Sequence, residues 1–129
     1  MFNWRRPTNL GVKEGRLAPC RRTPNCVSSQ ADPADREHYI MPIAFNGTMH
    51  ELRRAVESMT RATVIREEGS YLYAEYKSAL MGYVDDVELL LDEKARLVHV
   101  RSASRLGRSD FGVNRKRIEE LRTLIGSRR

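Results

Sequence analysis

One stretch of the sequence concentrates arginine, serine and glycine, which are residue types that bind anions. It runs from Ser102 to Gly112, and we expect it to be a loop between a strand and a helix. Hydroxyl groups, backbone N–H groups that glycine leaves accessible, and guanidinium groups near a helix N-terminus all favour phosphate or carboxylate. The residues predicted to hold such a ligand are Arg101, Ser102, Ser104, Arg105, Arg108, Ser109, Asp110, Asn114, Arg115 and Arg117.

The same loop also has a purely structural interpretation. Ser109, Asp110 and Asn114 are residue types that cap turns and helices, and the arginines could bind nearby carboxylates or backbone carbonyls. The Gly-x-x-x-x-Gly-Lys-Ser/Thr spacing of a phosphate-binding P-loop is absent. Both interpretations stay open at this point.

A second group of polar residues is acidic: Asp85, Asp86 and Glu88 lie close together on a predicted strand. In a cleft, carboxylates close to one another can have raised pKa values and act as acid or base, while Arg101 or Arg105 would stabilise negative charge. This predicts an enzyme as the alternative to a binding domain. The structural interpretation is a ladder of cross-strand ion pairs on a solvated sheet face.

A third group surrounds the two cysteines. Pro19 and Pro24 fix the backbone here, so we expect a structured turn in which side chains bond to the backbone. Its residues are Cys20, Asn25, Cys26, Ser28 and Ser29. The cysteines are close enough to form a disulfide in an oxidising compartment, whereas in the cytoplasm they would usually be reduced. Together with His38 and His99 they match no common metal framework, so no metal site and no cofactor is predicted.

Length and charge narrow the functional classes. A chain of 129 residues is long enough for one domain, and its net charge of +6 is spread along the sequence with acidic residues mixed in. Nucleic-acid binding is therefore not favoured. No apolar run is long enough to span a bilayer and no targeting signal is visible, which predicts a cytoplasmic protein. The expected partner is an anionic small molecule or an acidic protein surface.

The elements that must position these residues follow from periodicity. Residues 39–45 suggest a strand that Pro42 breaks or confines to an edge. Thr48 and Glu51 form a capping-box pattern for a helix that extends to Met59. Two hairpins follow, and the chain closes with a helix capped by Asn114. The predicted ranges are strands 62–68, 70–78, 83–92 and 96–102 and a helix that ends at Gly126.

This order predicts one α+β domain over residues 17–126, preceded by an irregular arm (1–16) and followed by a basic tail (127–129). A curved antiparallel sheet would be packed by helices, in an order similar to helix-grip domains and the TATA-binding protein. Strand alternation puts Leu72, Ala74 and Tyr76 on one face of the sheet, together with Val87, Leu89, Leu91, Val98 and Val100. The opposite face then carries Tyr71, Tyr73, Glu75, Lys77, Asp86, Glu88, His99 and Arg101.

Several motifs resemble an uncharacterised family catalogued as domain of unknown function 1499. They are Pro19-Cys20 with Pro24-Asn-Cys-Val-Ser-Ser29, Tyr83-Val-Asp-Asp-Val-Glu88, and the arginine-rich stretch from Val100 to Glu119. The resemblance runs in consistent order from about Leu17 to Leu124. It implies domain boundaries and singles out the motif residues, and it implies no particular reaction or ligand.

Overall fold

The centre of the fold is an antiparallel meander of four strands, in a computed structural model that describes residues 5–79, 82–107 and 109–126. The strands are β5 (Ala62–Glu68), β6 (Tyr71–Lys77), β7 (Val84–Asp92) and β8 (Leu97–Ser104). They form because β-branched and aromatic residues alternate with polar ones and glycine supplies the first turn, where Gly69 has a φ of +59°. The predicted meander is therefore confirmed.

Two short strands extend the sheet at the outer edge of β8. β3 (Cys26–Ser28) pairs with residues 101–103 of β8, and β4 (Ile43–Ala44) pairs with residues 97–98. The sheet order is β3-β8-β7-β6-β5, with β4 beside β8. The predicted strand over 39–45 is indeed broken at Pro42, and β3 lies in the segment that the sequence predicted as a structured turn.

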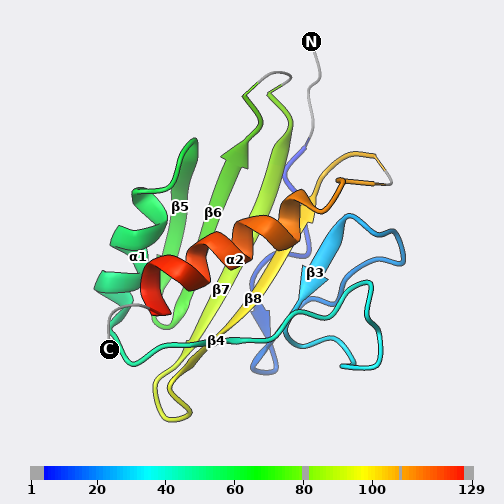
Figure 1. Ribbon diagram of the computed structural model, residues 1–129. Coiled ribbons are helices and arrows are strands. Elements are labelled where there is room, and N and C mark those ends of the chain that lie inside the picture. The colour runs from blue at the N-terminus through cyan, green and yellow to red at the C-terminus, as the bar shows by residue number, and fades with distance from the viewer. Residues whose placement is uncertain (1–4, 80–81, 108, 127–129) are drawn as a thin grey trace.

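Two helices cover one face of this sheet (Figure 1). α1 (Met49–Glu57) begins with the predicted capping box, in which Thr48 and Glu51 each bond to the other's backbone N–H group. α2 (Val113–Gly126) directs Ile118, Leu121 and Ile125 toward the sheet. The α+β class with an antiparallel sheet packed by helices is confirmed, while the helix-grip or TATA-binding-protein order stays a prediction.

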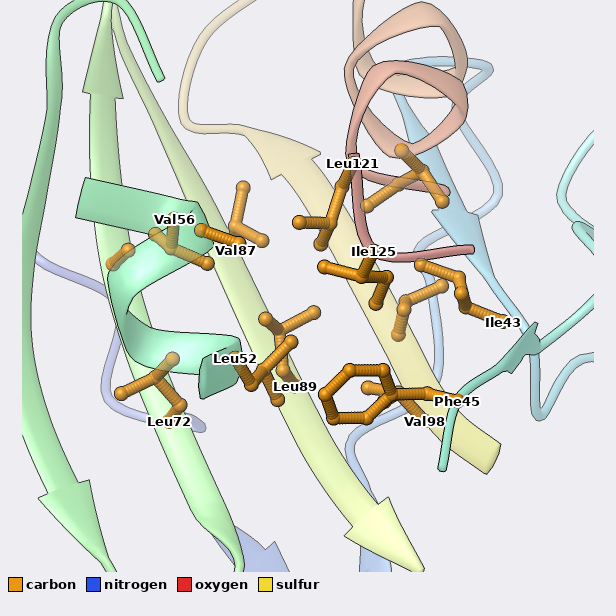
Figure 2. Packing of buried hydrophobic residues seen from close by; sticks show 14 of the residues in the cluster. Ile43, Phe45, Leu52, Val56, Leu72, Val87, Leu89, Val98, Leu121 and Ile125 are labelled. Atoms are coloured by element: carbon orange, nitrogen blue, oxygen red, sulfur yellow. The ribbon is translucent and has the colours of Figure 1, made fainter. Parts of the chain in front are cut away.

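The main core lies between the helices and the sheet. Figure 2 shows Leu52 and Val56 of α1 and Leu121 and Ile125 of α2 beside apolar side chains of the strands. Strand register brings the predicted face together, because Leu72 pairs with Leu89 and Leu89 pairs with Val100. The predicted apolar face is thus the buried face against the helices.

The N-terminal segment lies on the opposite face of the sheet. It contains a small hairpin of β1 (Val12–Lys13) and β2 (Arg16–Leu17). Leu17 packs with Tyr71 and Tyr73 in a second, smaller core that Leu10 and Leu90 adjoin. The sheet is therefore covered on both faces. Neither helix in the described part of the chain has the length and apolar character needed to cross a membrane.

The edge strand β5 is irregular. Its register with β6 shifts between Val64, which pairs with Ala74, and Arg66, which pairs with Tyr73. Ile65 is the additional residue in this bulge, and it is 38% exposed. A bulge of this kind bends the strand and increases its local twist.

Candidate functional site

The polar face of the meander is buried, which corrects the prediction of a solvated ladder. Glu88 is 0% exposed, Asp86 is 1% exposed and Arg101 is 5% exposed. Cross-strand pairing places Tyr73 opposite Glu88 and Glu88 opposite Arg101. The N-terminal segment covers these groups, and its backbone contributes directly, since the Gly11 N–H group donates to Glu88 Oε2 at 2.7 Å.

Arg105 joins two carboxylates on this face. Its Nε donates to Asp86 Oδ2 at 2.9 Å and its Nη2 to Asp86 Oδ1 at 2.8 Å, and Nη2 also donates to Glu75. The Tyr73 hydroxyl lies within hydrogen-bond distance of Asp86 Oδ1 and Glu75 Oε2, which share its one proton. Hydrogen bonding to Asp86 raises the pKa of Arg105, and burial raises the pKa of Tyr73. Both carboxylates are therefore held by fixed donors.

Glu88 has its own set of donors. Its Oε2 accepts from the Tyr71 hydroxyl at 2.6 Å, and its Oε1 lies 3.4 Å from Arg101 Nη1. Burial, and then the hydrogen bond to Glu88, raises the pKa of Tyr71, which keeps this phenol protonated. The carboxylates on this face are thus bound by buried tyrosine and arginine side chains.

Glu75 gives this network a measurable pH dependence. Burial alone would raise its pKa, but hydrogen bonds from Arg6, Tyr73 and Arg105 outweigh burial and lower the pKa to about 2. A carboxyl group whose pKa is lower in the folded state than in the unfolded state stabilises the fold. This contribution is complete above the unfolded-state pKa of about 4.3, and it is lost as the pH falls toward 2. We predict that Glu75→Gln flattens the pH dependence of the free energy of unfolding between pH 5 and pH 2, as measured by urea denaturation. If the free energy of unfolding of Glu75→Gln varies with pH as steeply as that of the wild type, the lowered pKa of Glu75 is contradicted.

A cleft opens where β8 meets the cysteine turn and the N-terminal segment. Its volume is about 220 Å³, and we call it the arginine pocket. Arg5 and Arg21 lie on its exposed rim, and Arg101 and Arg105 lie on its wall. The remaining lining residues are Pro7, Asn9, Thr23, Asn25, Cys26, Asp86, Ala103, Ser104 and Gly107.

Arg101 is incompletely bonded in the wall of this pocket. Its Nε is buried and has no hydrogen-bond partner among the residues that the structure describes. Its two other contacts, Nη1 to Glu88 and Nη2 to the Pro19 carbonyl, are both 3.4 Å long. Charge-assisted hydrogen bonds are usually about 2.7–2.9 Å. A buried guanidinium with an unpaired donor and long contacts is a poorly satisfied cation.

Asn114 is not a helix cap, which corrects the sequence prediction. The helix begins one residue earlier, at Val113, and the Asp110 carboxylate accepts from the backbone N–H groups of Gly112 and Asn114. The Asn114 side chain is fully buried and accepts from the Ser102 hydroxyl at 2.6 Å. Its amide donates to Asp110 Oδ2, the Ser104 hydroxyl and the Asn25 carbonyl. Asn114 therefore ties α2 to β8 and to the cysteine turn.

Asp85 is separated from Asp86 and Glu88, with which the sequence grouped it. It accepts from Arg117 Nη1 at 2.8 Å on the helix side of the sheet. Burial raises the pKa of Asp85, and Arg117 opposes that rise. Arg115 donates to the backbone carbonyls of Arg36 and Glu37.

The structure places the predicted ligand residues in different surroundings. Arg101, Ser104 and Arg105 line the arginine pocket, whereas Ser102, Asp110, Asn114, Arg115 and Arg117 make the bonds given above. Ser109 accepts from the Phe111 N–H group, and Arg108 lies outside the described residues, as does the tail 127–129. Sequence reasoning missed Arg5 and Arg21, for which no periodic signal exists, because both lie in irregular segments.

The cysteine turn is closed by a disulfide between Cys20 and Cys26. Asn25 donates to the carbonyls of Leu106 and Gly107, and Ser29 accepts from the Val100 N–H group, so side chains of this turn bond to the backbone. The pairing contradicts the reduced state expected for a cytoplasmic protein, and it weighs against the cytoplasmic location, which stays a prediction.

We predict that replacing both cysteines with serine lowers the free energy of unfolding by about 2 kcal/mol, because closing this short loop restricts the unfolded chain. Urea denaturation measures the effect, and a dithiol reductant should reproduce it in the wild-type protein. A reductant that leaves wild-type stability unchanged would show that the cysteines are unpaired in solution.

Three potential metal ligands lie near one another: Asp35 and Glu37, which are exposed, and His38, which is buried. Both ring nitrogens of His38 are already engaged, by Asp35 Oδ2 and by the Thr23 carbonyl, each at 2.8 Å. The cysteines are bonded to each other, and His99 Nδ1 contacts the Ser29 hydroxyl. The two cysteines, His38 and His99 thus each have a protein partner in place of a metal ion.

Comparisons with known proteins identify a family. The model of a protein of unknown function, DUF1499, matches residues 16–125. The comparisons with curated proteins and with solved structures gave no match. The matched range includes β2 through nearly all of α2, and it begins after Arg5, which lies on the rim of the arginine pocket.

Proposed function

Because the chain belongs to DUF1499, a family of proteins of unknown function, we propose a function from the geometry: the domain binds an anionic small molecule in the arginine pocket. One observation carries this proposal. The buried Arg101 has an unpaired Nε and long contacts, and it lies in the wall of a cleft that three further arginines line. An oxyanion seated there would accept from the guanidinium group of Arg101, whose present contacts are both 3.4 Å long.

The carboxylate in the pocket does not oppose an anion strongly. Both oxygens of Asp86 accept hydrogen bonds from Arg105, and the Tyr73 hydroxyl adds another. Its negative charge is therefore balanced by Arg105. An acidic protein surface fits less well, because a cleft of about 220 Å³ admits only a small group.

The enzymatic alternative has less support. A general base needs a carboxylate that can take a proton from a substrate, whereas Asp86 and Glu88 already accept from tyrosine and arginine donors. Asp85 is paired with Arg117 away from the arginine pocket. We therefore propose binding, with Arg21 and Arg101 as the principal contacts.

Calorimetric titration of the wild-type chain with sulfate, in a chloride buffer, tests the proposal. We predict that Arg21→Ala weakens sulfate binding about tenfold, which corresponds to about 1.4 kcal/mol. Arg22→Ala is the matched control, because Arg22 is also exposed, follows Arg21 in the same turn and does not line the pocket. Its effect should stay under about twofold, as expected for a screened surface charge. If both variants weaken sulfate binding equally, net charge alone attracts sulfate, and the arginine pocket is not its binding site.

A further inference from the structure

The two rim arginines of the pocket have no carboxylate partner in the part of the chain that the structure describes. Arg105 is paired with Asp86 and Glu75, and Arg101 lies nearest to Glu88. Arg5 and Arg21 form no ion pair within 4.0 Å with any residue in the ranges 5–79, 82–107 and 109–126. The pocket thus presents two positive charges that the described protein does not neutralise.

We infer that the ligand of the arginine pocket is a small dianion, with either one phosphate monoester group or two carboxylates. This inference rests on the proposed function. A dianion would balance both rim charges, whereas a monoanion would leave one of them unmatched beside the buried Arg101. Charges in a partly enclosed site are screened less than charges on an open surface, so the second charge should contribute to affinity.

The size of the pocket limits the rest of the ligand. The volume of the pocket is about 220 Å³. This is below the range of about 300–1,000 Å³ that is usual for drug-sized ligands. The pocket therefore fits a phosphate with a short carbon chain or a short dicarboxylate, and a nucleotide would extend beyond it.

The test compares four anions by calorimetric titration of the wild-type chain: sulfate, glycerol 3-phosphate, malonate and formate. At pH 7.5 we expect formate to bind at least tenfold more weakly than sulfate. The tighter of glycerol 3-phosphate and malonate then identifies the phosphate or the dicarboxylate as the preferred chemistry. Arg21→Ala should weaken the binding of sulfate, glycerol 3-phosphate and malonate.

A pH change separates dianion binding from simple anion attraction. The second pKa of a phosphate monoester is about 6, so the dianion falls from nearly all of the ligand at pH 7.5 to roughly a tenth at pH 5. Affinity for glycerol 3-phosphate should fall about tenfold. Sulfate stays a dianion, so its titration reports any change in the protein itself. The protein groups that face the ligand are Arg5, Arg21, Arg101, Arg105 and Asp86, with Glu75 and Glu88 behind them.

The outcomes distinguish the two proposals. If formate binds as tightly as sulfate and Arg21→Ala still weakens binding, the pocket binds anions and the dianion inference is wrong. If glycerol 3-phosphate keeps its affinity at pH 5 while sulfate is unchanged, the inference is also wrong. If no anion binds in a way that depends on Arg21, both the inference and the proposed function are wrong.

Discussion

Replacing Arg105 with methionine should lower the free energy of unfolding by about 3–5 kcal/mol, the range typical of a buried ion pair that loses one partner. Arg105 supplies three donors to Asp86 and Glu75, and its side chain is only 8% exposed. Methionine fills a similar volume but leaves both carboxylates without their common cation. Urea denaturation at pH 7 measures the loss.

Two variants make the Arg105 prediction specific. Arg105→Lys should recover only part of the stability, because an ammonium group cannot bond Asp86 through two parallel N–H groups. Arg53→Ala removes an arginine that also contacts two carboxylates, Glu57 and Glu67, but at the surface. That control should change stability by less than about 1 kcal/mol. Similar losses for Arg105→Met and Arg53→Ala would show that the buried network contributes no more than a surface pair.

The second large effect is expected at Asn114, where alanine should lower the free energy of unfolding by about 2–4 kcal/mol. Its side chain accepts from the Ser102 hydroxyl and donates to the Ser104 hydroxyl and the Asp110 carboxylate, while the Asn25 carbonyl also accepts from the Ser104 N–H group. Each buried polar group left without a partner costs about 1–3 kcal/mol. Thermal or urea denaturation measures the loss directly.

Asn114→Asp tests whether the amide donors are what matters. Aspartate has the same shape and can still accept from Ser102, but when ionised it cannot donate to the Asn25 carbonyl, and it places a second carboxylate beside Asp110. It should destabilise at least as much as alanine. Thr123→Ala, at an exposed position of the same helix, should cost under about 0.5 kcal/mol. A stable Asn114→Asp variant would contradict the role of the amide.

Periodicity in the sequence was sufficient to predict the meander, both helices and the apolar face. Strand pairing brings Leu72, Leu89 and Val100 to one face. A one-residue change of register in any of these strands would move its apolar residues to the other face. The capping box of Thr48 and Glu51 could also be predicted, because its two residues are close together in the sequence. These features depend on neighbours in the sequence.

The polar face was predicted wrongly because its covering element carries no periodic signal. Strands β1 and β2 have two residues each, and the contact of Gly11 with Glu88 spans 77 positions in the sequence. Tyr71 and Tyr73 on that face were the available signal, since two large aromatic side chains are more often buried than solvated. The arginine pocket needed the same long-range information, because its rim comes from Arg5 and Arg21.

The bulge at Ile65 has a consequence for how molecules of this protein meet one another in solution. A straight, apolar outer strand would offer its free backbone groups to a second molecule and could seed aggregation. Here the kink at Ile65 is followed by Arg66, Glu67 and Glu68, so the outermost strand is both bent and charged. Bent, charged edges resist strand addition from another chain. The irregularity that weakens pairing within β5 thus protects the protein from self-association along that edge.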